Sequence, residues 1–293
     1  IGKPNITISF IYMNLKEFCL RLKLQQGLGI TTIGKIVANF TAGEEVTVDK
    51  IESLSLKSNI QNLVLAAMKN DKFNSWIERI ELQCDVITIF DTIYPNALRE
   101  MYNAPTLLFT RGDLSLLKKE ITVIVGARQP TNYSRFVLKQ LIPQLIQQDF
   151  VIASGLARGV DGIAHQETLK NHGKTIAVIG NGLNHFYPQE NKMLQEEIMA
   201  KGLLISEYLP DTPPRPHRFP QRNRILAGLS KNIIVTEARK RSGSLITANI
   251  ALEENRNIFA VPGPVSSPLS EGPNDLIAAG AYPLVNADFK NLL

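Results

Sequence analysis

The sequence predicts an α/β protein with a Rossmann-like, doubly wound and mostly parallel sheet, preceded by a helical unit. Glycine and proline become frequent after about residue 120, with 13 of each in residues 121–293 against 6 Gly and 3 Pro before. From there, short apolar runs that suit strands buried on both faces alternate with helical patterns. The 293 residues, 44% hydrophobic and 20% charged, are enough for a packed core and exclude disorder as the main state.

The first part of the chain has helical patterning. We expect residues 1–12 to be an extension outside the fold, because a better helix opens at Met13. An amphipathic segment over 15–24 is broken at Gly27-x-Gly29 and resumes through 33–37, and further helices are expected at about 50–58, 58–69 and 71–83. This arrangement is similar to a SAM-like or helix-hairpin-helix unit, whose turn amides can face a phosphate, although a simple helix–helix turn explains the glycines equally well.

The expected domains are a helical unit over 13–84 and a sheet domain over 85–293, whose core starts near 120. Residues 86–90 and 107–109 are expected to be short strands or a connecting segment. The six expected strands of the sheet are 121–125, 151–153, 175–179, 203–205, 233–235 and 258–261. The helices expected between them are 133–148, 159–171, 190–201, 220–229 and 243–255. Pro143 lies inside the first of these and is expected to kink or split it.

The loops after the expected strands hold the candidate binding residues, since open α/β sheets bind ligands beyond the carboxyl ends of their strands. Residues 215–241 contain eight basic residues and one acid, so they carry +7 in a chain of net charge +5. This indicates a phosphate-rich partner, and the alternative is a solvated surface run. Lys174, before a strand, is either a turn lysine or a phosphate contact. The candidates in the loops are Gly126, Arg128, Ser154, Gly155, Arg158, Gly159, Gly180, Gly182, Arg222, Arg224, Lys240, Arg241, Ser242, Gly243 and Ser244.

Signals for catalysis are weak. There is no GxxxxGK[ST], and Gly180-Asn181-Gly182 lacks the third glycine of a dinucleotide fingerprint, so a nicotinamide enzyme is disfavoured. His165 follows Asp161 by four residues, so both could lie on one helix face. As an acid–base pair they are less well explained than as an N-terminal Asp cap near a histidine whose hydrogen bonds are satisfied. Tyr187 can stack on bases or anchor an apolar loop. We expect no catalytic residue, metal or cofactor.

The two cysteines, Cys19 and Cys84, form no CxxC, which indicates a reducing cytoplasm. No apolar run is long enough to span a membrane, so no membrane partner is expected.

Six stretches resemble the DNA-processing protein A family, also called DprA or Smf. They are 125–134, 154–169, 173–191, 219–230, 241–263 and 271–281. The resemblance implies a cytoplasmic homodimer that binds and protects single-stranded DNA and loads RecA recombinase onto it during natural transformation, without enzymatic activity. It implies a dimer contact around 270–285. Many members of the family carry a C-terminal winged helix, which we do not expect here because the sequence ends 30 residues after Pro262-Gly263. The phosphate-facing positions that it implies are Arg128, Lys174, Arg222, Arg224, Lys240 and Arg241, and the stretch 219–230 adds Asn223.

The sequence departs from the family pattern at three positions. Ser134 and Asn255 stand where glycine is usual, and Asn184 stands where aspartate is usual. None of these departures removes a basic residue from the candidate site.

The alternative function is a Rossmann-type enzyme that binds or hydrolyses nucleotides, similar to the LOG proteins that cleave nucleoside monophosphates. Those proteins use a PGGxGTxxE loop, and the corresponding stretch 241–248 lacks the second glycine and the glutamate. This difference favours binding over catalysis. A third possibility, a pocket that takes a mononucleotide as a regulator, stays open.

Overall fold

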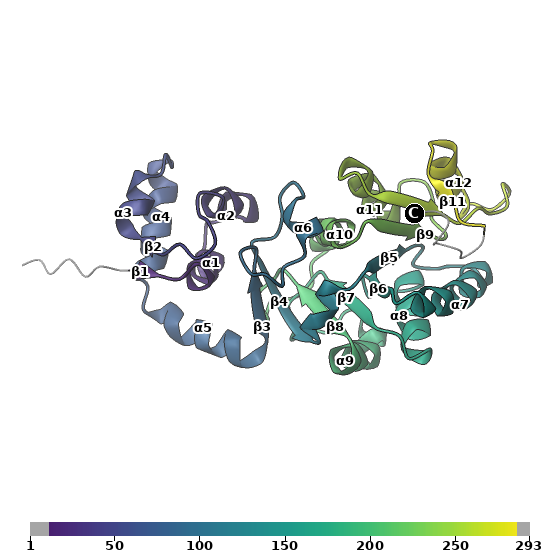
Figure 1. The fold of residues 1–293 in the computed structure, drawn as a ribbon, viewed down its shortest axis with the longest axis horizontal. Helices are drawn as coiled ribbons and strands as arrows, with labels where there is room; N and C mark the ends of the chain where they lie inside the picture. The colour runs from purple at the N-terminus through teal and green to yellow at the C-terminus, as the bar shows by residue number, and fades with distance from the viewer. Residues whose placement is uncertain (1–11, 286–293) are drawn as a thin grey trace, which may run out of the picture.

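The computed structural model describes residues 12–285, which form an elongated molecule with a helical unit at one end and a large sheet at the other (Figure 1). The extension expected over residues 1–12 lies outside the described residues except for Tyr12. In residues 12–285, no helix is both long and apolar enough to cross a membrane.

The helical unit matches the expected pattern closely. The Asn14 side chain caps the first helix by accepting a hydrogen bond from the Glu17 amide at 2.9 Å. Gly27 adopts a φ of +88° in the turn before the second helix, a conformation that favours glycine. The elements are β1 (Tyr12–Met13), α1 (Leu15–Leu24), α2 (Ile30–Val37), β2 (Val46–Thr47), α3 (Val48–Ser53), α4 (Ser58–Lys69) and α5 (Lys72–Gln83).

Helix α3 is shorter than the expected helix over 50–58. It ends at Ser53, because Leu54 takes an extended conformation with a ψ of 138°. The chain needs residues 54–57 as a turn, since α4 packs against both α1 and α3 and therefore runs in a new direction.

The sheet contains the six expected strands and extends beyond them at both edges. Its order among the described residues is β11-β10-β9-β5-β6-β7-β8-β4-β3. The segments expected as strands or connections are β3 and β4, which pair antiparallel with each other, and β4 also pairs antiparallel with β8. The remaining pairs are parallel. The bounds are β3 (Asp85–Thr88), β4 (Leu107–Gly112), β5 (Ile121–Val125), β6 (Val151–Ser154), β7 (Thr175–Ile179), β8 (Leu203–Ser206), β9 (Asn232–Val235), β10 (Asn257–Ala260) and β11 (Tyr282–Pro283).

Helices cover both faces of the sheet, so alternate strand residues enter different hydrophobic clusters. Ile124 and Ile152 pack with the helices after β5 and β6, whereas Val123 and Val125 pack on the opposite face with the helices after β8 and β9. The helices are α6 (Asn96–Arg99), α7 (Asn132–Gln147), α8 (Val160–Lys170), α9 (Lys192–Lys201), α10 (Arg218–Leu229), α11 (Gly243–Glu253) and α12 (Glu271–Ala278), with short 3₁₀ turns at Leu114–Lys118 and Gln189–Asn191.

Helix α7 runs without a break through Pro143, so the expectation of a split helix is wrong. A proline at this position removes the hydrogen bond to the carbonyl of Lys139, which is an exposed residue. The buried face of the helix, which includes Leu138, Leu141 and Ile142, keeps its packing.

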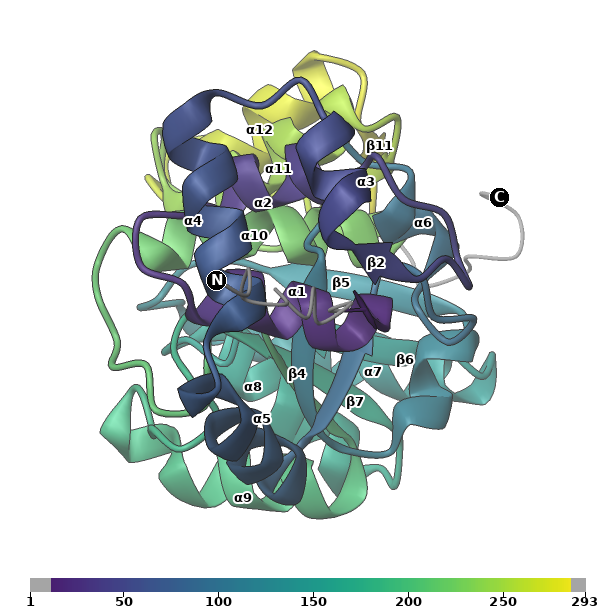
Figure 2. The same cartoon turned by 90° about the vertical axis from the view of Figure 1, so that its left-hand side faces the viewer.

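Strand β5 lies at the topological switch point of the sheet. The chain runs from β5 outward through β6, β7 and β8, then crosses back through α10 to β9 on the other side of β5. The helices that follow the two halves therefore diverge above the carboxyl ends of β5 and β9, which is where open α/β sheets place their ligands. In Figure 2, viewed from the helical unit, the central strands lie behind α1–α5.

Candidate functional site

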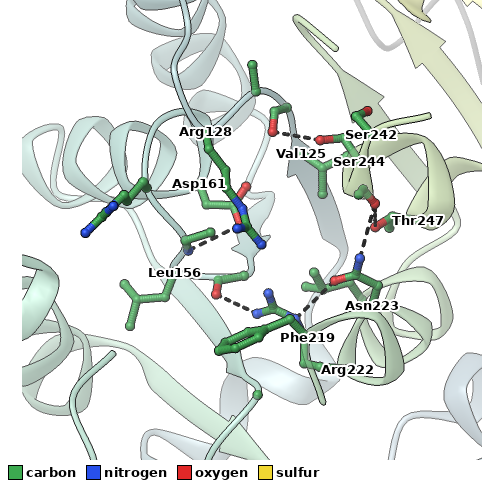
Figure 3. A pocket seen from close by; sticks show the side chains of 18 of the residues that line it. Val125, Arg128, Leu156, Asp161, Phe219, Arg222, Asn223, Ser242, Ser244 and Thr247 are labelled. Carbon is green, nitrogen blue, oxygen red and sulfur yellow. Dashed lines mark hydrogen bonds between the residues drawn. The ribbon is translucent and has the colours of Figure 1, made fainter. Parts of the chain in front are cut away.

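A cavity of about 510 Å³ lies at this switch point, at the carboxyl ends of β5, β6, β7 and β9 (Figure 3). Its walls are the loops after these strands together with the first turns of α10 and α11. Loops from distant parts of the sequence thus meet at one edge of the sheet, as the positions of the strand ends predict.

The loop after β5 is held close to the start of α11. Ser244 donates a hydrogen bond to the carbonyl of Gly126 at 2.7 Å. A Cβ at Gly126 would lie 2.6 Å from the Thr236 hydroxyl, so only glycine lets β5 and β9 approach here. Two residues later, the exposed side chain of Arg128 reaches into the centre of the cavity (Figure 3). Among residues 12–285, no acid lies within ion-pair distance of its guanidinium.

Arg222 also lines the cavity, but its guanidinium group already forms hydrogen bonds within the protein. Its side chain is buried, and Nη1 donates to the carbonyls of Gly155 and Val178. Burial lowers the pKa of Arg222 to about 10, and the nearby Asp161 carboxylate opposes this shift. We therefore correct the expectation that Arg222 is a free phosphate ligand. Instead, its guanidinium links the carboxyl ends of β6 and β7 through these two hydrogen bonds.

Asp161 lies in the cavity wall while His165 does not. The Asp161 carboxylate accepts a hydrogen bond from the Ala157 amide at 3.3 Å, and burial raises its pKa against the opposing charge of Arg222. His165 is fully buried, with Nδ1 2.6 Å from the Thr175 hydroxyl at the opposite end of β7. Two such separated groups do not form an acid–base pair around one ligand.

The start of α11 faces the cavity. Ser242 caps the helix by accepting a hydrogen bond from the Leu245 amide at 3.4 Å, and Asn223 of α10 donates to the Gly243 carbonyl at 3.2 Å. The amides of Gly243 and Ser244 belong to the first turn and have no partner within the helix, so they present partial positive charge to a ligand.

Two aromatic rings form part of the cavity wall. Tyr187 and Phe219 have ring centroids 5.0 Å apart at an interplanar angle of 33°, and Tyr187 is 45% exposed. Phe219 lies against Gly180, where a Cβ would approach its ring to 2.8 Å. Tyr187 therefore belongs to the cavity, and Phe219 is a site residue that sequence reasoning missed. The sequence feature that could have identified Phe219 is its position in the basic segment 215–241, three residues before Arg222.

The structure changes the assignment of basic residues in the loop after β9. Lys240 is paired with Asp275 at 3.3 Å, and Arg241 is exposed at a φ of +59°; neither lines the cavity. Arg239, which sequence reasoning did not single out, does line it. Three adjacent cations on a loop point in different directions, and the sequence pattern alone does not tell which one faces inward.

Two further predicted cations lie elsewhere. Arg224 is on the other side of α10 and pairs with the buried Glu207 at 2.5 Å. Lys174 precedes β7, at the amino end of the strand, and donates to the Lys201 carbonyl at 3.2 Å. It therefore lies at the opposite edge of the sheet from the cavity, because the carboxyl end of β7 is the end that lines it. Arg158 lines the cavity but is paired with Glu190.

Three small residues predicted to face phosphate instead support the fold. Ser154 is buried and donates to the Ile124 carbonyl at 2.6 Å. Gly159 has a φ of +75° and lies so close to the β5 loop that a Cβ would meet the Ala127 carbonyl at 2.3 Å. Gly182 is held against the backbone of residues 209–210, where a Cβ would come within 2.2 Å. None of the three lines the cavity.

No group of three or more His, Cys, Asp or Glu side chains within residues 12–285 is placed to hold a metal ion. The cavity's uncommitted groups are cations, amides and aromatic rings. This combination is suited to binding an anionic, partly aromatic ligand.

Comparison with known proteins shows the family to which the chain belongs. The family model of DNA recombination-mediator protein A matches residues 85–291, which is more than half of the chain. The chain belongs to this family. The DNA recombination-mediator protein A family thus accounts for the whole sheet, including the antiparallel strands β3 and β4.

Among curated members of the family, DNA processing protein DprA of Bacillus subtilis is 39% identical over 252 residues, which cover 84% of this chain and 81% of that protein. DprA of Streptococcus pneumoniae is 48% identical over 194 residues, 66% of this chain and 68% of that protein. The match to protein Smf of Escherichia coli, 43% identical, spans 50% of that protein's length.

Two solved structures of the family resemble this one. DprA from Streptococcus pneumoniae aligns with a TM-score of 0.78 at 36% identity, covering 94% of this chain and 96% of that chain. DNA processing protein A from Helicobacter pylori, which has a described single-stranded DNA binding mode, aligns with a TM-score of 0.65 at 32% identity, covering 71% and 95% of the two chains.

The departures from the DprA pattern have local explanations. Asn184 donates to Asp211 at 2.6 Å and to Gln83 at 2.9 Å, bonds that a carboxylate cannot make. Asn255 has a φ of +55°, a conformation that favours glycine and that asparagine tolerates. Ser134 is buried with its hydroxyl 3.2 Å from that of Thr236.

Proposed function

We propose that this chain binds single-stranded DNA at the cavity described above and acts in the cytoplasm as a homodimer that protects incoming DNA and loads RecA recombinase onto it. The observation that carries the proposal is that Arg128, which has no ion pair within the described residues, lines the same cavity as the Tyr187–Phe219 ring pair and the first turn of α11. Membership of the DNA recombination-mediator family, and the single-stranded DNA binding of the Helicobacter pylori relative, support it.

The chemistry of the cavity suits an unpaired strand. Arg128 and the α11 amides offer charge and hydrogen bonds to a backbone phosphate, and the rings offer a surface on which an unstacked base can pack. The bases of a duplex are already stacked on each other, so they do not reach such rings. Because these contacts are to phosphate and to the base face, sequence preference should be poor.

We infer that the chain binds rather than transforms its ligand. The only carboxyl group among the described residues that line the cavity is that of Asp161, and the nearest histidine in sequence, His165, points away from the cavity. Binding of RecA and dimer formation are further parts of the proposal, supported by the family and not by any partner surface described above.

The proposal is tested by fluorescence anisotropy of a labelled single strand of about 15 nucleotides, at low and high salt, beside a duplex of equal length. We expect the single strand to bind more tightly, with affinity that falls with salt by a logarithmic slope of about −0.7 for each neutralised phosphate. Arg128→Glu should weaken binding about tenfold or more, because it removes one charge-assisted contact and adds repulsion.

Lys174→Glu is the matched control, since it makes the same change of charge at the opposite edge of the sheet. It should bind the strand as the parent does. Equal affinities for the parent and Arg128→Glu would place the DNA path elsewhere, and release of free base from AMP by the purified chain would favour an enzyme instead.

A further inference from the structure

The charge of the cavity is not balanced by the protein. Four arginines line it, and two of these already interact within the protein. Arg158 is paired with Glu190, and Arg222 is bound to backbone carbonyls and lies near the carboxylate of Asp161, which also lines the cavity. The other two, Arg128 and Arg239, have no acid within ion-pair distance in the described part of the chain. Two uncompensated positive charges therefore face the same cavity.

One phosphodiester does not match this charge. A phosphate inside a DNA strand carries a single negative charge, whereas a phosphomonoester carries about −1.5 to −2 at pH 7 and has three terminal oxygens that accept hydrogen bonds. Two free guanidinium groups and the amides of Gly243 and Ser244 supply enough donors for three such oxygens. The donor set is therefore better matched to a terminal phosphate than to an internal one.

The size of the cavity leads to the same ligand. Its volume of about 510 Å³ lies within the range of about 300–1,000 Å³ that small-molecule sites occupy. Beyond the cationic residues, the lining combines a ring pair, an apolar inner wall that includes Val125 and Leu226, and polar side chains such as those of Asn223, Ser244 and Thr247. A phosphate bound at the arginines would leave an attached base within the same partly open cavity, which also holds the ring pair.

We propose that the cavity binds a single nucleotide with a terminal phosphomonoester, supplied either by the phosphorylated end of a DNA strand or by a free nucleoside monophosphate. In this role Arg239 is the residue that distinguishes the monoester from an internal phosphate, because it adds the second positive charge. This inference rests on the proposed DNA-binding function for the strand end, and not for the free nucleotide.

The test uses the full chain in competition against a labelled single strand that ends in a 5′-hydroxyl. The competitors are the same strand with a 5′-phosphate, the same strand with a 5′-hydroxyl, dTMP and thymidine. We expect the 5′-phosphorylated strand to compete about tenfold better than the 5′-hydroxyl strand, the factor for one added charge-assisted contact. We expect dTMP to displace the labelled strand and thymidine not to.

The competitors distinguish a phosphorylated strand end from a free nucleotide as the ligand. They also distinguish failure of this inference from failure of the proposed DNA-binding function. An advantage of the 5′-phosphorylated strand without competition by dTMP identifies the strand end as the source. Equal competition by the two strands, with no effect of dTMP, overturns the inference and leaves DNA binding standing. If no strand binds, the proposed function fails, and direct calorimetric titration with dTMP then decides the inference alone, by binding or by its absence.

Two variants localise the effect. Arg239→Gln should reduce the tenfold advantage of the 5′-phosphate to less than about twofold while the 5′-hydroxyl strand still binds. Arg79→Gln, which removes an exposed arginine from α5 in the helical unit, should keep the full advantage. If Arg239→Gln weakens both strands by the same factor, Arg239 does not discriminate the terminal phosphate and the assignment is wrong.

Discussion

At the scale of single residues, an arginine is available to a ligand only if its guanidinium does not already interact with other groups of the protein. Arg128 and Arg222 have the same side chain and both line the cavity, yet Arg222 is buried against two carbonyls while Arg128 is exposed and unpaired. A sequence shows the residue type and not the partner. The commitment of each arginine depends on residues that are far away along the chain, such as Gly155 for Arg222.

Burial also changes the protonation of His165, and this leads to a prediction on stability. The Thr175 hydroxyl donates to the Ile152 carbonyl, so the Nδ1–H of His165 donates to Thr175 and the ring is neutral. Burial, reinforced by the charge of Arg222, lowers the pKa of His165 to about 3 from its usual 6.5. Between these values the unfolded chain binds a proton that the folded chain does not, so stability falls as pH falls below about 6.5.

We expect His165 to lower the free energy of unfolding by about 1.4 kcal/mol for each unit by which the pH falls between pH 6 and pH 4. His165→Asn, which keeps a donor toward Thr175 but does not titrate, should lose that part of the slope in urea unfolding followed across this range. The control is His172→Asn, an exposed position with a φ of +58° that asparagine tolerates. It should keep the parent's slope, and an identical slope in all three proteins would contradict the buried neutral ring.

At the scale of elements, the six expected strands are predictable because they are buried on both faces along almost their whole length. The continuous apolar runs at 121–125 and 175–179 occur in the structure with the expected bounds. The antiparallel pairing of β3 with β4, and of β4 with β8, was not predictable from these runs. Pairing partners are chosen by which edge of the sheet remains open, and that depends on the fold of the rest of the chain.

The loops at the strand ends contain glycines with different roles, which a pair of alanine variants can separate. A Cβ at Gly155 would lie 2.5 Å from the guanidinium of Arg222, which is buried and cannot move aside without losing its carbonyl bonds. Gly155→Ala should therefore lower the free energy of unfolding by about 1–3 kcal/mol. It should also weaken DNA binding, because Arg222 supports the cavity wall.

The matched control is Gly243→Ala, since a Cβ there has no heavy atom within 4 Å and the backbone needs no positive φ. Its free energy of unfolding should be unchanged or raised by up to about 1 kcal/mol, owing to the reduced entropy of the unfolded chain. Chemical denaturation measures both variants. Equal stability of Gly155→Ala and the parent would mean that Arg222 does not need its present position.

At the scale of the whole molecule, the prediction of a homodimer concerns the β11 edge of the sheet. Strand β11 is the last strand of the sheet among the described residues. Tyr282 in this strand is 45% exposed, and Val285, two residues after its end, is 76% exposed. This edge lies in the region 270–285 where the family resemblance implies a dimer contact, which stays a prediction. A dimer would join two cavities on one strand and raise the affinity through avidity.

We expect Val285→Asp to shift the chain toward a monomer in size-exclusion chromatography with light scattering, because the contact would bury an unpaired charge. The affinity for a long DNA strand should then fall roughly 10²-fold or more, because a monomer lacks the avidity of two linked cavities. Val265→Asp makes the same change on a loop where the side chain is 95% exposed, and should leave the mass and the affinity as in the parent. A dimer that survives Val285→Asp would move the contact to another surface.

The sequence by itself determined the alternation of strands and helices, the edge of the sheet where the cavity lies, and the family. These depend on local properties: apolar runs of strand length, glycines at their ends, and a dense basic segment. Even the boundary between the helical unit and the sheet domain, which stays a prediction, rests on such a local change in composition.

Only the tertiary structure decided which basic residues line the cavity. In the structure, Arg239 lies in the cavity wall, whereas Lys240 and Arg224 form ion pairs with acidic residues. Lys174 lies at the opposite edge of the sheet. The physical reason is that the direction of a side chain, and the charge that neutralises it, are fixed by packing between segments distant in sequence. Local patterns contain no information on such neighbours.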